Sequence, residues 1–205
     1  NLKKKCSVNG LEGAHRTRWK HECDGGMNAD CGGVVAEFAP MLTPKEMLSR
    51  GIFGGTYFSQ LVDPADFPSD WFDVLEGDMY RADRYRADLN HFKVRSGQSQ
   101  QEWEASGWIH SDDPRGWFEW YCKYHLGRRH EDDERQIKRW LAFCGPNGRW
   151  RNRIYARIHS VGCGVELSWG VSNRIQQSLL HWSYMVNDAD YESWKVTKEI
   201  SDIPG

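Results

Sequence analysis

Residues 113–127 read DPRGWFEWYCKYHLG and carry the clearest helix signal in the chain. Large aromatic residues recur there at the i, i+3, i+4, i+7 spacing of one helix face: Trp117, Trp120, Tyr121 and Tyr124. A second face carries Phe118, Cys122 and His125. Because a helix that is apolar on two faces has other elements around it, the stretch predicts a buried central helix.

The ends of this helix are marked by residue type. Asp113 and Pro114 are the types preferred at the N-cap and at the first helical position, and Gly127 is the type that ends a helix. We therefore expect the Asp113 carboxylate to cap the helix. This interpretation competes with a functional role for the same residue, which is considered below.

Helix signals recur on both sides of the central stretch. The expected helices are one opened by Thr43-Pro44-Lys45-Glu46, one opened by Ser99-Gln100-Gln101-Glu102, and others over about 131–143, 171–185 and from Asp188 onward. Strand signals are weak. Residues 153–161 and 164–170 could pair as one short hairpin.

The composition favours a folded, mainly α protein. The 205 residues include eleven Trp, eight Tyr and eight Phe, whereas chains without fixed structure are poor in aromatic residues. No run approaches the roughly 18–20 apolar residues of a membrane span, so none is expected. We expect a single compact Trp-rich helical domain over residues 41–205 and a loop-rich Gly/Cys/His arm over residues 1–40.

Several stretches resemble a family of uncharacterised proteins of fungi, algae and plants. The matching stretches are TPKEML at 43–48, GIFGGTY at 51–57, GWI at 107–109, DPRGWFEWYC at 113–122, GRR at 127–129, RQI at 135–137, RW at 139–140 and LLHW at 179–182. The family more often has Gln and Arg where this chain has Glu119 and Gln176. The resemblance implies a shared fold and no particular activity.

The N-terminal arm holds the residue types of a zinc site. Its candidate ligands are Cys6, His15, His21, Cys23 and Cys31. The spacing lacks the short pair of cysteines found in zinc fingers. A disulfide between Cys23 and Cys31, or free thiols, are the alternatives. Six cysteines in the whole chain are too few for a disulfide scaffold, which favours an intracellular location, and the remaining three are expected to be packed thiols: Cys122, Cys144 and Cys163.

Residues 128–157 are rich in arginine. They hold nine basic residues against four acidic ones in a chain whose net charge is −2. Arginine suits phosphate, and aromatic side chains can stack on unpaired bases. The leading hypothesis is a protein that binds nucleic acid through this segment, with these candidate contacts: Arg128, Arg129, Arg135, Arg139, Arg149, Trp150 and Arg151. The alternative is that the arginines pair internally, since Asp132 lies within helical reach of Arg135.

Two other classes of function remain open. An enzyme would use the helix start at Asp113, with His110, Asp112, Arg115 and His181 as candidates, because a His beside a carboxylate can move protons. His181, however, lies next to Leu180 and Trp182, and a histidine among apolar residues is more often packed in a core than catalytic. The second class is a structural subunit with protein partners, because so many tryptophans predict that some reach the surface.

Overall fold

A computed structural model of the chain describes residues 37–59, 64–73 and 75–201. Within these ranges the regular structure is helical, and no strand is present. The α-helices are α2 (Pro44–Ser49), α3 (Gln100–Ala105), α4 (Trp117–His125), α5 (Asp133–Cys144), α6 (Arg149–Val161), α7 (Asn173–Leu180) and α8 (Asp188–Ser201). Short 3-10 helices lie at Pro64–Asp66, Ser69–Trp71, Gly77–Met79, Ala87–Leu89 and Val165–Leu167. The prediction of a mainly α, Trp-rich domain is confirmed.

The expected hairpin is wrong. Residues 153–161 belong to α6, and residues 165–167 form a 3-10 helix. The buried positions of α6 are Ile154, Tyr155 and Ile158, which share one helix face. Their β-branched and aromatic side chains explain the strand signal. The segment is a helix because these side chains pack together against the core from one helix face.

The central helix is buried as predicted but begins later than expected. All residues from Trp117 to Cys122 are buried, and so is Tyr124. The N-cap is Gly116, at φ 79°, and α4 starts at Trp117. Asp113 therefore does not cap α4. Its carboxylate is instead bound by Arg128, whose position no local pattern could indicate.

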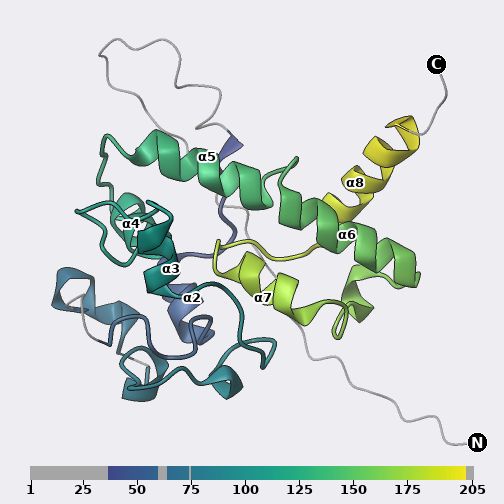
Figure 1. Ribbon diagram of the computed structural model, residues 1–205. Helices are drawn as coiled ribbons and strands as arrows, with labels where there is room; N and C mark the ends of the chain where they lie inside the picture. The colour runs from purple at the N-terminus through teal and green to yellow at the C-terminus, as the bar shows by residue number, and fades with distance from the viewer. Residues whose placement is uncertain (1–36, 60–63, 74, 202–205) are drawn as a thin grey trace, which may run out of the picture.

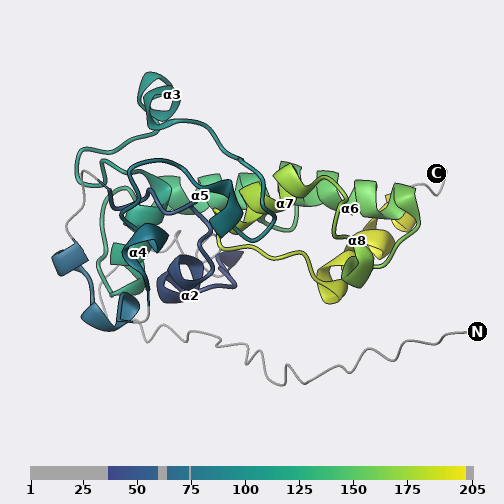
Figure 2. The same cartoon turned by 90° about the horizontal axis from the view of Figure 1, so that it is seen from below.

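Two successive helices, α5 and α6, form one side of the molecule. The described part of residues 50–99, which has only short 3-10 helices and which we call the irregular layer, lies at one end (Figure 1). In Figure 1, α5 and α6 follow one another along one side, with α7 beside α6. Contacts join α4 to α2 and α5, and α8 packs on α6. The view in Figure 2 shows α8 at the opposite end of the molecule from α2, α4 and the irregular layer.

Aromatic rings join these helices. Trp182, which follows α7, lies 4.9 Å from Trp117 of α4 and 5.0 Å from Phe143 of α5, between ring centroids. The Trp140 indole donates to the Trp182 carbonyl at 2.7 Å. Phe38, near the end of the predicted arm, packs edge-on against Trp140 at 5.2 Å. None of the described helices is long and apolar enough to cross a membrane.

Candidate functional site

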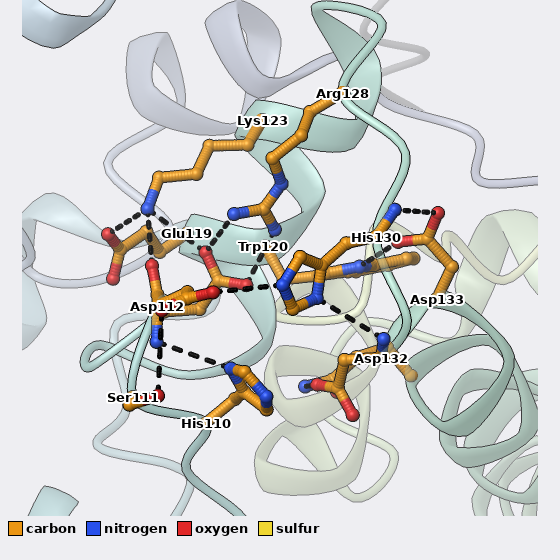
Figure 3. Close-up of polar contacts among 12 residues, drawn as sticks. His110, Ser111, Asp112, Glu119, Trp120, Lys123, Arg128, His130, Asp132 and Asp133 are labelled. Carbon is orange, nitrogen blue, oxygen red and sulfur yellow. Dashed lines mark hydrogen bonds and ion pairs between the residues drawn. The ribbon is translucent and has the colours of Figure 1, made fainter.

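Two histidines and an aspartate meet where two loops approach each other, a group that we call the two-histidine cluster (His110, Asp112 and His130; Figure 3). His110 and Asp112 precede α4, and His130 lies between α4 and α5. The His130 Nε2 lies 2.9 Å from Asp112 Oδ2, and the two imidazole rings are 4.9 Å apart at 80°. Glu131 lies at the edge, with its Oε1 3.8 Å from His110 Nε2.

A buried ion pair holds the two loops together. Asp113 is completely buried, and the Arg128 guanidinium binds both of its carboxylate oxygens, at 2.9 and 2.6 Å. The Lys123 ammonium lies 3.0 Å from Asp113 and 2.7 Å from the buried Glu119. Burial lowers the pKa of Lys123, but its hydrogen bonds to Glu119 and Asp113 outweigh burial, so this pKa lies above its usual value. One buried carboxylate thus fixes the loop that carries His110 and Asp112 against Arg128, two residues before His130.

Backbone amides determine which nitrogen of each neutral imidazole ring carries the proton. The Asp112 N–H donates to Nδ1 of His110, and the Asp132 N–H donates to Nδ1 of His130, each at 3.2 Å. A neutral imidazole that accepts at Nδ1 carries its proton on Nε2. Each Nε2–H therefore points toward a carboxylate, Asp112 or Glu131. In this arrangement neither ring offers a free lone pair, so neither is ready to act as a general base.

The structure brings together only part of the predicted catalytic set. His110 and Asp112 are neighbours in the cluster, whereas Arg115 points away from it. The Arg115 guanidinium donates to the carbonyls of Thr56 and Tyr57 and lies over the Tyr57 ring at 5.2 Å. It is therefore not placed to hold an anion beside Asp113.

His181 lies apart from the cluster and packs in the interior. Its Nε2 is 3.1 Å from the Ile52 carbonyl, and its ring stacks on Phe53 at 5.2 Å. Burial lowers the pKa of His181 to about 4, against the opposing effect of the hydrogen bond to Ile52. The apolar neighbours of His181 in the sequence favoured this packing role over a catalytic one. His130, which sequence reasoning missed, had only the acidic run after it as a signal.

Four of the candidate arginines pair within the protein: Arg128, Arg135, Arg139 and Arg151. Arg135 binds Asp132 at 2.5 Å, as its helical spacing suggested, and Arg151 binds Asp190 at 2.9 Å. Arg139 lies between the rings of Trp108 and Trp182, at 5.3 and 5.4 Å. Burial, with the nearby charge of Arg135, lowers the pKa of Arg139 to about 10.

The other candidates face outward. Arg129 lies 3.9 Å over the Tyr124 ring. Arg149 lies 4.9 Å over the ring of Trp150, and Arg153 lies over the same ring at 5.5 Å. Trp150 also lines a groove of about 360 Å³, which we call the basic groove; its lining residues are Arg95, Ser96, Gly97, Trp150, Arg174, Ile175 and Ser178. None of these residues is acidic. Arg95 and Arg174 were not singled out in the sequence because they lie outside the arginine-rich segment.

The predicted zinc ligands of the arm, Cys6, His15, His21, Cys23 and Cys31, lie outside the described residues. Cys122 and Cys144 are buried free thiols whose pKa values are raised by burial, and Cys163 is partly buried. Among the tryptophans that the structure describes, two reach the surface: Trp108 is 37% exposed and Trp169 is 58% exposed.

Comparison with protein-family models finds no matching family, and neither the curated proteins nor the solved structures compared with the chain give a match. The resemblance of roughly residues 43–194 to a family of fungal, algal and plant proteins therefore stays an expectation.

Proposed function

We propose that this protein binds nucleic acid, with single strands preferred, through the basic groove and the adjoining face of α6. The observation that carries the proposal is the pairing, in one groove, of two arginines with an indole ring. Phosphates are bound by arginine, and unpaired bases stack on aromatic rings. The groove offers both kinds of contact within about 360 Å³.

The groove is formed by segments far apart in the sequence. Ser96 Oγ lies 2.5 Å from Ser178 Oγ and 2.7 Å from the Arg174 carbonyl, so the loop at 95–97 is attached to α7. Trp150 closes the groove from α6. These contacts hold Arg95 and Arg174 on a fixed surface, which reduces the conformational entropy lost when a ligand binds.

An arginine stripe continues the groove along α6. Arg149, Arg153 and Arg157 are four residues apart, so they share one helix face over about 12 Å. All three are exposed. Among the described residues, no carboxylate forms an ion pair with these three, with Arg95 or with Arg174. Their charge is available to phosphates, unlike that of Arg128, Arg135 and Arg151, which is neutralised by Asp113, Asp132 and Asp190.

The net charge of −2 makes the location of these arginines the decisive point. A protein without a global positive field binds a polyanion only where basic side chains gather. Binding should therefore depend on a few named residues and should weaken steeply with salt.

The test compares two double variants of the full chain. Arg153→Gln/Arg174→Gln removes two charges from the proposed surface, and Arg84→Gln/Lys198→Gln removes two exposed charges elsewhere. Binding of labelled single-stranded DNA, single-stranded RNA and duplex DNA is measured by fluorescence anisotropy across a salt series. For single strands, each lost phosphate contact reduces the slope of log K against log salt by about 0.7, so the first variant should lose about 1.4.

The control variant should keep the parent slope and affinity. Equal losses in both variants would show diffuse attraction and contradict the proposed surface. Absence of salt-dependent binding by the parent protein at low ionic strength would reject nucleic acid as the ligand. Preference for duplex over both single strands would contradict stacking on Trp150.

A further inference from the structure

We infer that the two-histidine cluster is a binding site for a divalent transition-metal ion of the zinc class. One ligand atom from each of His110, Asp112 and His130 lies within 4.8 Å of the other two. Donors bound to one tetrahedral ion at 2.0–2.2 Å lie about 3.3–3.6 Å apart, so these side chains must shift by about 1 Å to share an ion. The site shares no residue with the basic groove.

The chemistry of the three side chains selects the metal. Two imidazoles and one carboxylate suit Zn²⁺ and its first-row neighbours. Ca²⁺ and Mg²⁺ prefer all-oxygen sites and gain little from imidazole. Three protein ligands leave one tetrahedral position open, and the Glu131 carboxylate, 3.8 Å from His110 Nε2 and 84% exposed, is free to turn into it.

The backbone around the site is already fixed. The Asp113 N–H donates to the His110 carbonyl at 3.0 Å, which closes the turn that carries Asp112. On the facing loop, the His130 N–H donates to Asp133 Oδ2 at 2.9 Å (Figure 3). The buried pair of Asp113 and Arg128 then joins the two loops. Because the loops are in place before any ion arrives, binding a metal requires little ordering of the chain.

The present hydrogen bonds also limit the affinity. Ligation through Nε2 moves each ring proton to Nδ1, so it breaks the two 3.2 Å contacts with the amides of Asp112 and Asp132. The rings must turn slightly away from those amides. We therefore expect binding weaker than that of closed structural zinc sites.

The experiment uses Co²⁺ as a spectroscopic substitute for zinc, on the reduced full chain. Cysteine ligation produces intense thiolate-to-metal charge-transfer absorption, whereas a site of nitrogen and oxygen ligands shows only weak d–d bands. Equilibrium dialysis counts the ions bound by the parent and by His110→Gln/His130→Gln. The double variant should bind one ion fewer and keep any thiolate charge-transfer absorption unchanged. The control is His91→Gln/His159→Gln, which removes two exposed histidines outside the cluster and should bind as many ions as the parent.

Equal stoichiometry in the parent and in His110→Gln/His130→Gln would overturn the inference, and so would competition by equimolar Mg²⁺. Loss of the same ion from the histidine control would also overturn it. Thermal unfolding without metal checks that the variants remain folded. If the double variant unfolds, Asp112→Asn replaces it, since that side chain is 56% exposed, and should weaken Co²⁺ binding at least tenfold; unchanged affinity would again overturn the site.

Discussion

At the scale of single residues, buried amide side chains explain how a long irregular segment is held in place. Gln177 is fully buried on α7; it accepts from the Phe92 N–H at 3.1 Å and donates to the Ile52 carbonyl at 2.9 Å. Asn90, also fully buried, accepts from Val94 N–H at 3.1 Å and donates to its carbonyl at 2.7 Å. These amides satisfy backbone groups that would otherwise be satisfied by regular structure. Side chains therefore replace helix hydrogen bonds in this layer.

His181 gives the protein a predictable dependence on pH. Its pKa in the folded state is about 4, below the value of about 6.5 for an unfolded chain. Its contribution to stability is therefore fully present above pH 6.5 and is lost as pH falls toward 4, by up to about 3 kcal/mol. Urea unfolding at pH 7.5, 5.5 and 4.5 should show this loss in the parent. In His181→Asn the free energy of unfolding should fall clearly less over the same pH range.

A matched substitution is His91→Asn. The His91 side chain is exposed and its pKa is lowered mainly by partial burial, so this variant should keep most of the parent's pH dependence. A His181→Asn variant with the parent's full pH dependence would contradict the assignment to His181.

At the scale of elements, the two capping boxes were predicted correctly, whereas the hairpin and the Asp113 cap were not. Both capping boxes form as predicted: the Thr43 N–H donates to Glu46 at 2.7 Å, and the Ser99 N–H donates to Glu102 at 2.7 Å. Such motifs depend on residues three apart, so the sequence contains the whole interaction. Asp113 also had a local N-cap signal, but Arg128, fifteen positions away, binds its carboxylate instead.

The candidate site was predictable to a similar extent. His110 and Asp112 are two positions apart in the sequence and were predicted together. His130 comes from the next loop, and it reaches the cluster only because Arg128 and Asp113 pair across the gap. The arginine-rich segment divides into paired and unpaired residues for the same reason, since Asp190, the partner of Arg151, belongs to a different helix. Long-range pairing is the information that a single sequence does not display.

Two glycines at left-handed backbone positions should differ in their tolerance of alanine. At Gly162, the C-cap of α6, φ is 72° and an added Cβ would meet nothing within 4 Å. At Gly55, φ is 83° and the Cβ would lie 2.0 Å from the Asp78 carbonyl oxygen. Gly162→Ala should cost only the left-handed strain, about 1–2 kcal/mol. Gly55→Ala adds a forced backbone shift and should cost about 2–5 kcal/mol.

Chemical unfolding of both variants at neutral pH measures the difference directly. Equal destabilisation would show that the turn at residues 51–58 shifts without loss of stability. This would contradict its close packing on the 3-10 helix Gly77–Met79.

At the scale of the whole molecule, rings connect elements that lie far apart. The α8 helix lies at one end in Figure 2 and reaches the rest chiefly through α6. There Tyr191 packs on Tyr155 at 5.6 Å between centroids, and the Trp194 indole donates to Asn152 at 3.0 Å. From α6, Trp150 continues to Phe143 at 6.0 Å. The ring contacts thus form two groups that both include rings of α6: one joins α6 to α8, and the other joins α6 to α5 and, through Trp182, to α4.

Because α6 carries rings of both groups, we expect α4, α6 and α8 to unfold in one cooperative transition. The buried apolar residues of the described ranges form one cluster, which includes Trp120 and Trp140 as well as Tyr155 of α6 and Tyr191 of α8. Differential scanning calorimetry should give equal calorimetric and van't Hoff enthalpies, and tryptophan fluorescence should change together with far-UV circular dichroism. Native-state hydrogen exchange should give the slowest amides of α4 and α6 the same free energy of opening. A lower value confined to α6 and α8 would show that the contact between Trp150 and Phe143 does not couple α6 to α5, and the protein would then consist of two units with a boundary between α5 and α6.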